Sequence, residues 1–269
     1  MIVMSEIQDT ISLTAQYMAV VRAVEHKRVN RLFADPLAEK LAGKKIMAKI
    51  LPKVRDYEAQ GKPVVAVRTR FFDDFLISSA TNIRQIVILG AGMDTRAFRL
   101  PLHPDTHLYE LDRPEVMQRK ESLLSSVSAK CHRDSIPIDL RQSWFEQLII
   151  RGFQPSNPCI WLLEGLLYYL NPEEVMTILK TISDSAISGS KLGVDLLNKK
   201  MTSSNNGVAK YWQYGVDEPE RLLTELGWQP SVVQYGDEAA NYGRFMQQPA
   251  PRKVPDVARG FLVTATKSD

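Results

Sequence analysis

The stretch QIVILGAGMDTRAFRL, residues 85–100, decides the predicted fold. Its apolar run, residues 86–89, has the length of a buried strand and stops at a turn that contains Gly90 and Gly92. Glycine at such a turn lets the backbone approach a ligand closely. The stretch therefore predicts the first strand and turn of a doubly wound α/β sheet that binds a nucleoside.

A second apolar run, residues 108–111, is followed by Asp112, which lies 20 residues after Gly92. An acid at the end of the second strand of such a unit can accept hydrogen bonds from both hydroxyls of a ribose. Glu110 is a second candidate, because residues two apart in a strand share a face. The spacing indicates a nucleoside held at the switch point of the sheet.

The turn argues against a dinucleotide. Thr95 stands where a pyrophosphate-binding loop usually has its third glycine, and Asp94 places a negative charge where the diphosphate would lie. An NAD-dependent oxidoreductase would also need a catalytic pair such as Tyr-x-x-x-Lys, which we do not find in place. A cofactor with a cationic centre and no phosphate, such as S-adenosylmethionine (SAM), is the better match.

Composition excludes several classes of protein. The chain is 44% hydrophobic and 24% charged, and its net charge of +3 is too small to favour nucleic acid. No apolar run approaches the ~18 residues of a membrane helix, and the start of the chain lacks the pattern of a signal peptide. Cys131 and Cys159 cannot build a disulfide framework. We expect a cytoplasmic protein with neither a nucleic-acid nor a membrane partner.

The four histidines predict no metal site. His103 and His107 are four residues apart, but Pro101 and Pro104 argue against a helix that would bring them together.

Strand and helix signals alternate through the middle of the chain. Residues 10–59 and 65–80 are helical, and apolar runs predict five strands, at 86–89, 108–111, 135–140, 159–163 and 192–197. Helical segments are expected at 114–125, 142–151, 171–188 and 218–226. Such alternation predicts a doubly wound, mostly parallel sheet.

The end of the chain departs from this alternation. Residues 198–215 are polar and read as an insertion, which at this length is usually functional or mobile. Two late strands, 231–235 and 260–266, follow without a full helical crossover between them. They predict an antiparallel hairpin at the sheet edge. We divide the chain into an N-terminal helical cap, 1–64, and a core, 65–269.

Separated motifs run in order along nearly the whole chain: RAVEHKR (22–28), FADPLAEKLA (33–42), VAVRTRFFDDFL (65–76), YELDRPEVMQRK (109–120) and the stretch from PIDLRQSW to NPEEV (137–175), besides the glycine turn. With them the chain resembles the bacterial class I SAM-dependent methyltransferases related to leucine carboxyl methyltransferase. The resemblance implies a Rossmann-like, seven-stranded sheet, SAM as methyl donor with S-adenosylhomocysteine as product, and transfer to oxygen.

The resemblance also implies roles for single residues. Arg68 matches the arginine that pairs with the carboxylate of SAM, and Asp112 matches the acid that holds its ribose. Asp139 and Leu140 match the pair at the adenine, and Gly90 and Gly92 match the turn against the cofactor.

Other roles come from the residues themselves. Glu164 ends the fourth strand, where it could accept the cofactor ammonium, and a buried carboxylate there requires a nearby cation. Asp94 could contact the same amino group or cap a helix. Arg70, two residues after Arg68, is read as structural, and Lys27 as a solvated side chain.

The catalytic group is left open. Methyl transfer from a sulfonium requires alignment of the acceptor and no metal, and a base helps when the acceptor is a hydroxyl. Tyr168, Tyr169 and His26 are candidates, and Tyr211 and Tyr214 are further pocket residues. We expect O-methylation of a small molecule, with carboxyl methylation of a protein or peptide terminus and a non-catalytic SAM-binding protein as alternatives.

Overall fold

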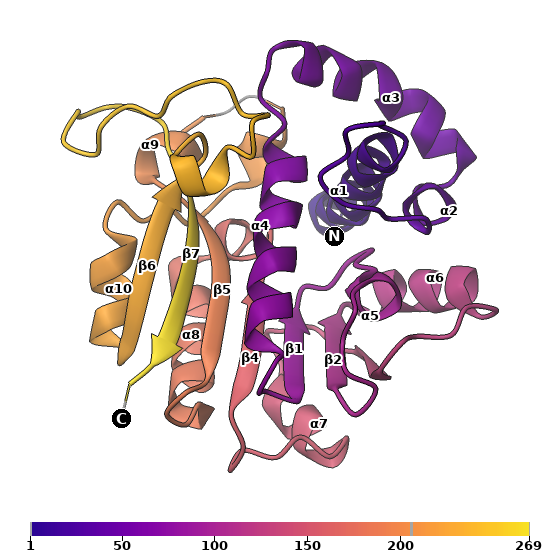
Figure 1. Cartoon of the computed structure of the whole chain (residues 1–269), viewed down its shortest axis with the longest axis vertical. Coiled ribbons are helices and arrows are strands. Elements are labelled where there is room, and N and C mark those ends of the chain that lie inside the picture. The colour runs from indigo at the N-terminus through magenta and orange to yellow at the C-terminus, as the bar shows by residue number, and fades with distance from the viewer. Residues whose placement is uncertain (1, 205–206, 269) are drawn as a thin grey trace.

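The computed structural model describes residues 2–204 and 207–268, with side chains for all of these except 2–13 and 57–58. Seven strands form one sheet in the order β3-β2-β1-β4-β5-β7-β6 (Figure 1). The strands are β1 (Gln85–Leu89), β2 (His107–Asp112), β3 (His132–Pro137), β4 (Cys159–Leu163), β5 (Lys191–Leu197), β6 (Trp228–Gln234) and β7 (Gly260–Lys267).

The first five strands are parallel, and β7 runs antiparallel between β5 and β6. Chain order turns back between β1 and β4, so the switch point of the sheet lies beside the glycine turn. The doubly wound sheet and its terminal antiparallel hairpin are confirmed.

Both faces of the sheet are covered. Along β1, Ile86 and Ile88 contact one apolar cluster that includes α1 (Ile2–His26) and α4 (Val64–Ser79). Val87 and Leu89 contact a second cluster, with α7 (Trp144–Ile150) and α8 (Pro172–Ser185). This alternation leaves β1 and β4 fully buried, as continuous apolar strands in a parallel sheet require.

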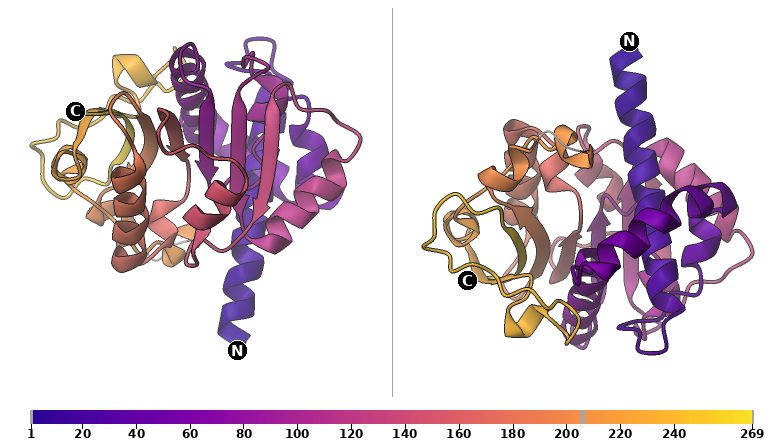
Figure 2. Two further views of the ribbon diagram at one scale, coloured as in Figure 1. Left: turned by 90° about the horizontal axis from the view of Figure 1, so that it is seen from below. Right: turned by 90° about the horizontal axis from the view of Figure 1, so that it is seen from above.

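The cap consists of α1, α2 (Ala38–Ala42) and α3 (Lys44–Ala59), which lie beyond the carboxyl ends of β1 and β2 (Figure 1). The amino-terminal part of α1 extends away from the rest of the molecule (Figure 2). Arg22 joins the cap to the core: its Nε lies 2.8 Å from Asp35 Oδ2, and its Nη2 donates to the carbonyl of Met93 in the glycine turn.

Two of the remaining helices, at 114–124 and 219–225, lie within one residue of their predicted ranges, whereas the short helices at 96–99 and 199–202 were not predicted. These four helices are α5 (Arg96–Arg99), α6 (Pro114–Leu124), α9 (Lys199–Thr202) and α10 (Pro219–Glu225), with 3₁₀ turns at Leu167–Tyr169, Gly207–Tyr211 and Glu238–Ala240. The start predicted for α8 is confirmed, and Asn171 and Glu174 form a capping box there. In the described part of the chain, no helix combines the length and apolar character needed to cross a membrane.

Two edge strands differ from their predictions. β6 begins at Trp228 rather than 231 and ends at Gln234 rather than 235. β3 begins at His132 rather than 135 and ends at Pro137, so Asp139 and Leu140 lie in the loop that follows it. β3 is an edge strand with mostly half-exposed residues, and its polar start, His132-Arg133-Asp134, does not give an apolar run. The displacement keeps Asp139 at the carboxyl edge of the sheet.

Candidate active site

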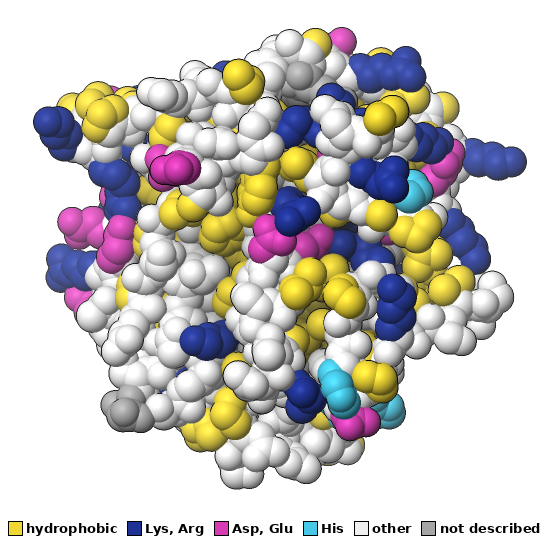
Figure 3. Space-filling view, in the orientation of Figure 1, with side chains coloured by type: hydrophobic (Ala, Val, Ile, Leu, Met, Phe, Trp, Pro, Cys, Tyr) yellow, Lys and Arg dark blue, Asp and Glu magenta, His cyan; other side chains and the backbone are white. Residues whose placement is uncertain are grey.

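A cavity of about 1680 Å³ opens at the carboxyl edge of the sheet. Its walls include the glycine turn, the ends of β2 and β4, and the cap helices α1 and α3. Residues predicted for the cofactor all line it: Arg68, Gly90, Gly92, Asp112, Asp139, Leu140 and Glu164. On the face in Figure 3, hydrophobic side chains are exposed around a small group of acidic and basic ones.

The glycine turn and Asp112 are joined directly. The N–H of Gly92 donates to Asp112 Oδ2 at 2.6 Å, and the N–H of Arg113 donates to Oδ1 at 2.7 Å. Burial raises the pKa of Asp112 above its usual range despite these two bonds. The carboxylate is thus fixed in orientation and poorly solvated, which suits an acceptor for ribose hydroxyls.

The turn also leaves room for a ligand. Gly90 has φ +69°, and a Cβ there would lie 2.9 Å from Leu166 Cδ1, in the wall of the cavity. Gly92 has φ +49°, which L side chains rarely adopt. Both glycines are therefore required by backbone conformation, and the turn fits the close approach of a cofactor.

Arg68 is at the centre of a buried ion-pair network. Its Nε lies 2.9 Å from Glu164 Oε1, and its Nη1 lies 2.8 Å from Asp195 Oδ2 and 3.1 Å from the Tyr168 hydroxyl. Among the described residues, the one hydrogen-bond acceptor of Nη2 is the sulfur of Met18, at 3.5 Å. A cofactor carboxylate would thus meet Nη2, rather than a guanidinium fork with two free nitrogens.

The expected cation beside Glu164 is present twice. Arg68 contacts Oε1, and Arg96 Nη2 lies 2.7 Å from Oε2. Burial opposes ionisation, but Arg96 and Arg68 hold the pKa of Glu164 below its usual range. Asp94 accepts from the N–H of Arg96 at 2.6 Å and pairs with its side chain, so it acts at the start of α5 and also lines the cavity.

Negative charge exceeds positive charge in this network. Arg68, Arg96 and Arg99 face four carboxylates, those of Asp73, Asp94, Glu164 and Asp195. Burial, together with the nearby charge of Glu164, raises the pKa of Asp195 even though Arg68 pairs with it. The surplus carboxylate favours a cationic group in the cavity, such as the ammonium or sulfonium of SAM.

Asp139 and Leu140 frame another part of the wall. Asp139 accepts from the N–H and the Nε of Arg141, at 3.0 and 2.9 Å, and the Arg141 side chain keeps the pKa of Asp139 low. The carboxylate therefore stays ionised, but Arg141 Nη2 also donates to Oδ2, so an exocyclic amine would share the carboxylate with Arg141.

The tyrosine candidates both line the cavity, but as neutral groups. Tyr168 is buried, and burial raises the pKa of its phenol well above the usual range. Burial also raises the pKa of Tyr169. Neither phenol is poised to lose a proton at neutral pH, so their positions favour packing and orientation over general-base catalysis.

Several predicted residues lie elsewhere. His26 does not line the cavity, and its Nδ1 accepts from the N–H of Asp35 at 3.2 Å. Glu110 is fully buried with Lys120 at 2.6 Å, away from the cavity, so the prediction of a second ribose ligand is wrong. Tyr214 also lies outside the cavity wall, whereas Tyr211 lines it.

The predictions for Arg70 and Lys27 are confirmed. Arg70 pairs with Asp74 at 2.9 Å and donates to the carbonyl of Leu32, which is a structural role. Lys27 is exposed and pairs with Glu39.

Sequence reasoning missed Asp195, Arg96 and Asp73. Asp195 carried a signal, because a lone acid within the apolar strand 192–197 must be buried and needs a cation. The connection between the two late strands was given no role, yet it supplies part of the cavity wall, including Phe245 and Arg259.

Comparisons with known proteins identify the family of the chain. Residues 15–183 match the family model described as leucine carboxyl methyltransferase. The chain is 35% identical to a protein of Frankia alni over 95% of this chain and 94% of that one, and 34% identical to one of Streptomyces avermitilis over 94% of each. Both relatives are provisionally named as SAM-dependent methyltransferases.

Solved structures share the fold. A structure from Thermobifida fusca, provisionally named as a methyltransferase, has a TM-score of 0.57 at 18% identity, covering 95% of this chain and 94% of that one. A DUF574 family protein from Streptomyces avermitilis has a TM-score of 0.56 at 12% identity, covering 93% and 96%. At sequence identities this low, the similarity shows that the fold is shared.

Proposed function

The chain belongs to the leucine carboxyl methyltransferase family and is a SAM-dependent methyltransferase, and from this premise we propose that it methylates an oxygen of a small organic acceptor. SAM would supply an electrophilic methyl group. Transfer would form a C–O bond as the C–S bond of the sulfonium breaks and would leave S-adenosylhomocysteine as product, with Gly90, Gly92 and Asp112 placed to hold the nucleoside. The residues of the chain hold both molecules in line.

The observation that carries the proposal is the extent of the cavity. Ligand sites typically measure roughly 300–1000 Å³, and this cavity, at about 1680 Å³, has room for a second molecule beside the cofactor. Beyond the cofactor residues it is lined by apolar side chains of α3, Ile46, Ile50 and Val54, and by Val208 and Phe245. An apolar acceptor of modest size fits this part of the cavity.

The acceptor oxygen should be acidic. No histidine of the described chain lines the cavity, Glu164 and Asp195 are paired with arginines, and the two tyrosine phenols are neutral. With no ready base among these residues, a carboxylate or a phenol is a better acceptor than an aliphatic hydroxyl. Lys49, Lys53, Lys62 and Lys210 also line the cavity and would attract an anion.

The test is a methyl-transfer assay with isotopically labelled SAM. A panel of apolar carboxylic acids and phenols is compared with the corresponding neutral alcohols, and methylated products are identified by mass spectrometry. We expect turnover of acidic members only. Lys53→Met should raise the KM for such an acceptor, whereas Lys45→Met, on the same helix but outside the cavity wall, should not.

The same assay separates the alternatives. Methylation of a peptide terminus gives a base-labile ester on peptides with a free carboxyl end and none on amidated peptides. A non-catalytic binder would bind S-adenosylhomocysteine but label no acceptor. Turnover of neutral alcohols at the same rate as acids would contradict the proposed acceptor class. The proposal includes a cytoplasmic location, which the two free cysteines support.

A further inference from the structure

Three metal-ligating side chains meet at the other end of the sheet. The parallel register of β2 and β3 places His107 beside His132 and Tyr109 beside Asp134. Since residues two apart in a strand share a face, His132 and Asp134 point to the same side as His107. The sequence argument weighed only the pairing of His103 with His107, whereas strand register brings His107 and His132 together.

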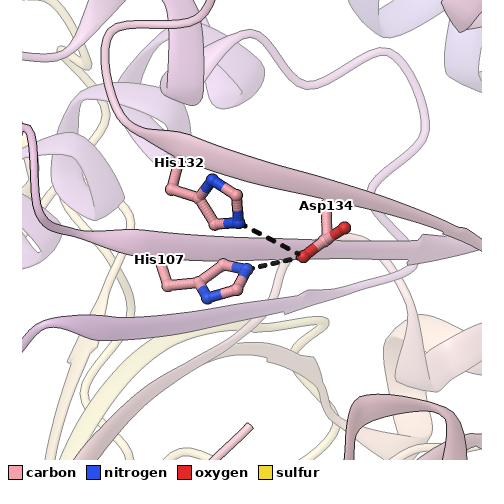
Figure 4. A group of neighbouring side chains, drawn as sticks. All are labelled: His107, His132 and Asp134. Carbon is pink, nitrogen blue, oxygen red and sulfur yellow. Dashed lines mark hydrogen bonds and ion pairs between the residues drawn. The ribbon is translucent and has the colours of Figure 1, made fainter. Parts of the chain in front are cut away.

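The ligand atoms converge on one point (Figure 4). Asp134 Oδ2 lies 2.6 Å from His107 Nε2 and 3.8 Å from His132 Nε2, and the three ligand atoms all lie within 4.8 Å of one another. In a tetrahedral zinc site with bonds of about 2.0–2.1 Å, ligand atoms are ~3.3 Å apart. The observed separations bracket that value, so small side-chain rotations would complete the geometry.

The surroundings hold the ligands in place. His107 Nδ1, the ring nitrogen that would not bind the metal, lies 2.9 Å from the hydroxyl of Tyr109, and the two rings are stacked. Arg151 Nη1 lies 3.5 Å from Oδ1 of Asp134, which leaves Oδ2 directed toward the histidines. Contacts of this kind orient metal-binding imidazoles and carboxylates in proteins. The His132 side chain is 66% exposed, so an ion can reach the site.

From this geometry we propose that His107, His132 and Asp134 bind one divalent transition-metal ion, of the class of Zn²⁺ or Co²⁺, with water completing the coordination. Two imidazoles and one carboxylate, with no thiolate, suit these ions and not Mg²⁺ or Ca²⁺. The three residues do not line the cavity, so the ion has no part in methyl transfer. It joins the edge strand β3 to β2.

The proposal is tested on tag-free protein with zinc chloride and cobalt chloride as probes. We expect calorimetry to show one Zn²⁺ per chain, Zn²⁺ to raise the melting temperature, and Co²⁺ to give the intense visible bands of a four-coordinate ion. His132→Asn and Asp134→Asn should each weaken Zn²⁺ binding at least tenfold and abolish the cobalt spectrum. Affinity for S-adenosylhomocysteine should stay the same in both variants.

Two variants serve as matched controls. His103 lies near Asp105 on the surface, with a 3.6 Å contact, and Cys131 is the thiol next to His132 in sequence. His103→Asn and Cys131→Ser should keep wild-type Zn²⁺ affinity. Equal Zn²⁺ binding by wild type and His132→Asn, or loss of binding in either control alone, would overturn the assignment.

Discussion

The N–H of Gly92 donates to Oδ2 of Asp112 across 2.6 Å, so the turn after β1 and the acid after β2 form one unit. Removal of the carboxylate by Asp112→Ala should weaken S-adenosylhomocysteine binding by about 1–3 kcal/mol, because a hydrogen-bond partner of the ribose and the support of the turn are both lost. Calorimetric titration measures this. Glu115→Ala, at an exposed position on α6, is the control. Unchanged affinity for Asp112→Ala would refute the ribose role.

Alanine substitutions at Gly90 and Gly189 would separate the cost of backbone strain from the cost of a steric clash with Leu166. Both have positive φ, +69° and +83°, but a Cβ meets Leu166 at Gly90 and open space at Gly189. Each substitution by alanine should cost about 1–2 kcal/mol of stability from backbone strain. Only Gly90→Ala should also reduce affinity for S-adenosylhomocysteine, since Leu166 lines the cavity. Equal cofactor affinity in the two variants would argue against the glycine turn as a ligand cradle.

Glu164→Gln should destabilise the protein by about 1–3 kcal/mol at neutral pH, because Arg68 and Arg96 each lose one charged hydrogen-bond partner while keeping Asp195, Asp73 and Asp94. The pKa of Glu164 is lowered in the folded state, so its contribution is fully present above the ordinary value of 4.5 and is lost as the pH falls below it. Urea unfolding of wild type and variant at pH 7.5 and pH 4 should show the difference shrink in acid. A constant difference would contradict the assignment.

The capping box of α8 gives a prediction on stability. Asn171 accepts from the N–H groups of Glu173 and Glu174, both at 3.0 Å. Asn171→Ala should lower the free energy of unfolding by about 1 kcal/mol. Lys180→Ala, exposed on the same helix, should change it by less than about 0.5 kcal/mol in the same denaturation experiment.

The sequence predicted the parts of the fold that depend on local pattern. Continuous apolar runs located β1, β4 and β5, because strands buried on both faces admit few polar residues. The edge strand β3 was displaced, since its exposed positions carry His132 and Asp134 rather than an apolar run. Strand bounds predicted from apolar runs are least accurate where one face of the strand is exposed to solvent.

The sequence predicted most of the residues that line the candidate site. It did not predict the buried ion pairs that connect them. Gly90, Gly92 and Asp112 follow from a motif whose members are close in sequence. The pairing of Arg68 with Asp195 joins residues 127 apart, and the fork predicted for a cofactor carboxylate is largely occupied by Glu164 and Asp195. Such partners are fixed by the crossing of α4 over the sheet, which no local pattern records.

The contact from Arg22 to the carbonyl of Met93 makes the cap and the glycine turn energetically interdependent. Coupling between two sites is reciprocal, so a cofactor that holds the turn must also hold α1, and a loosened α1 must release the cofactor more readily. Arg22 also pairs with Asp35 of the cap, so the cap and the glycine turn share one buried side chain.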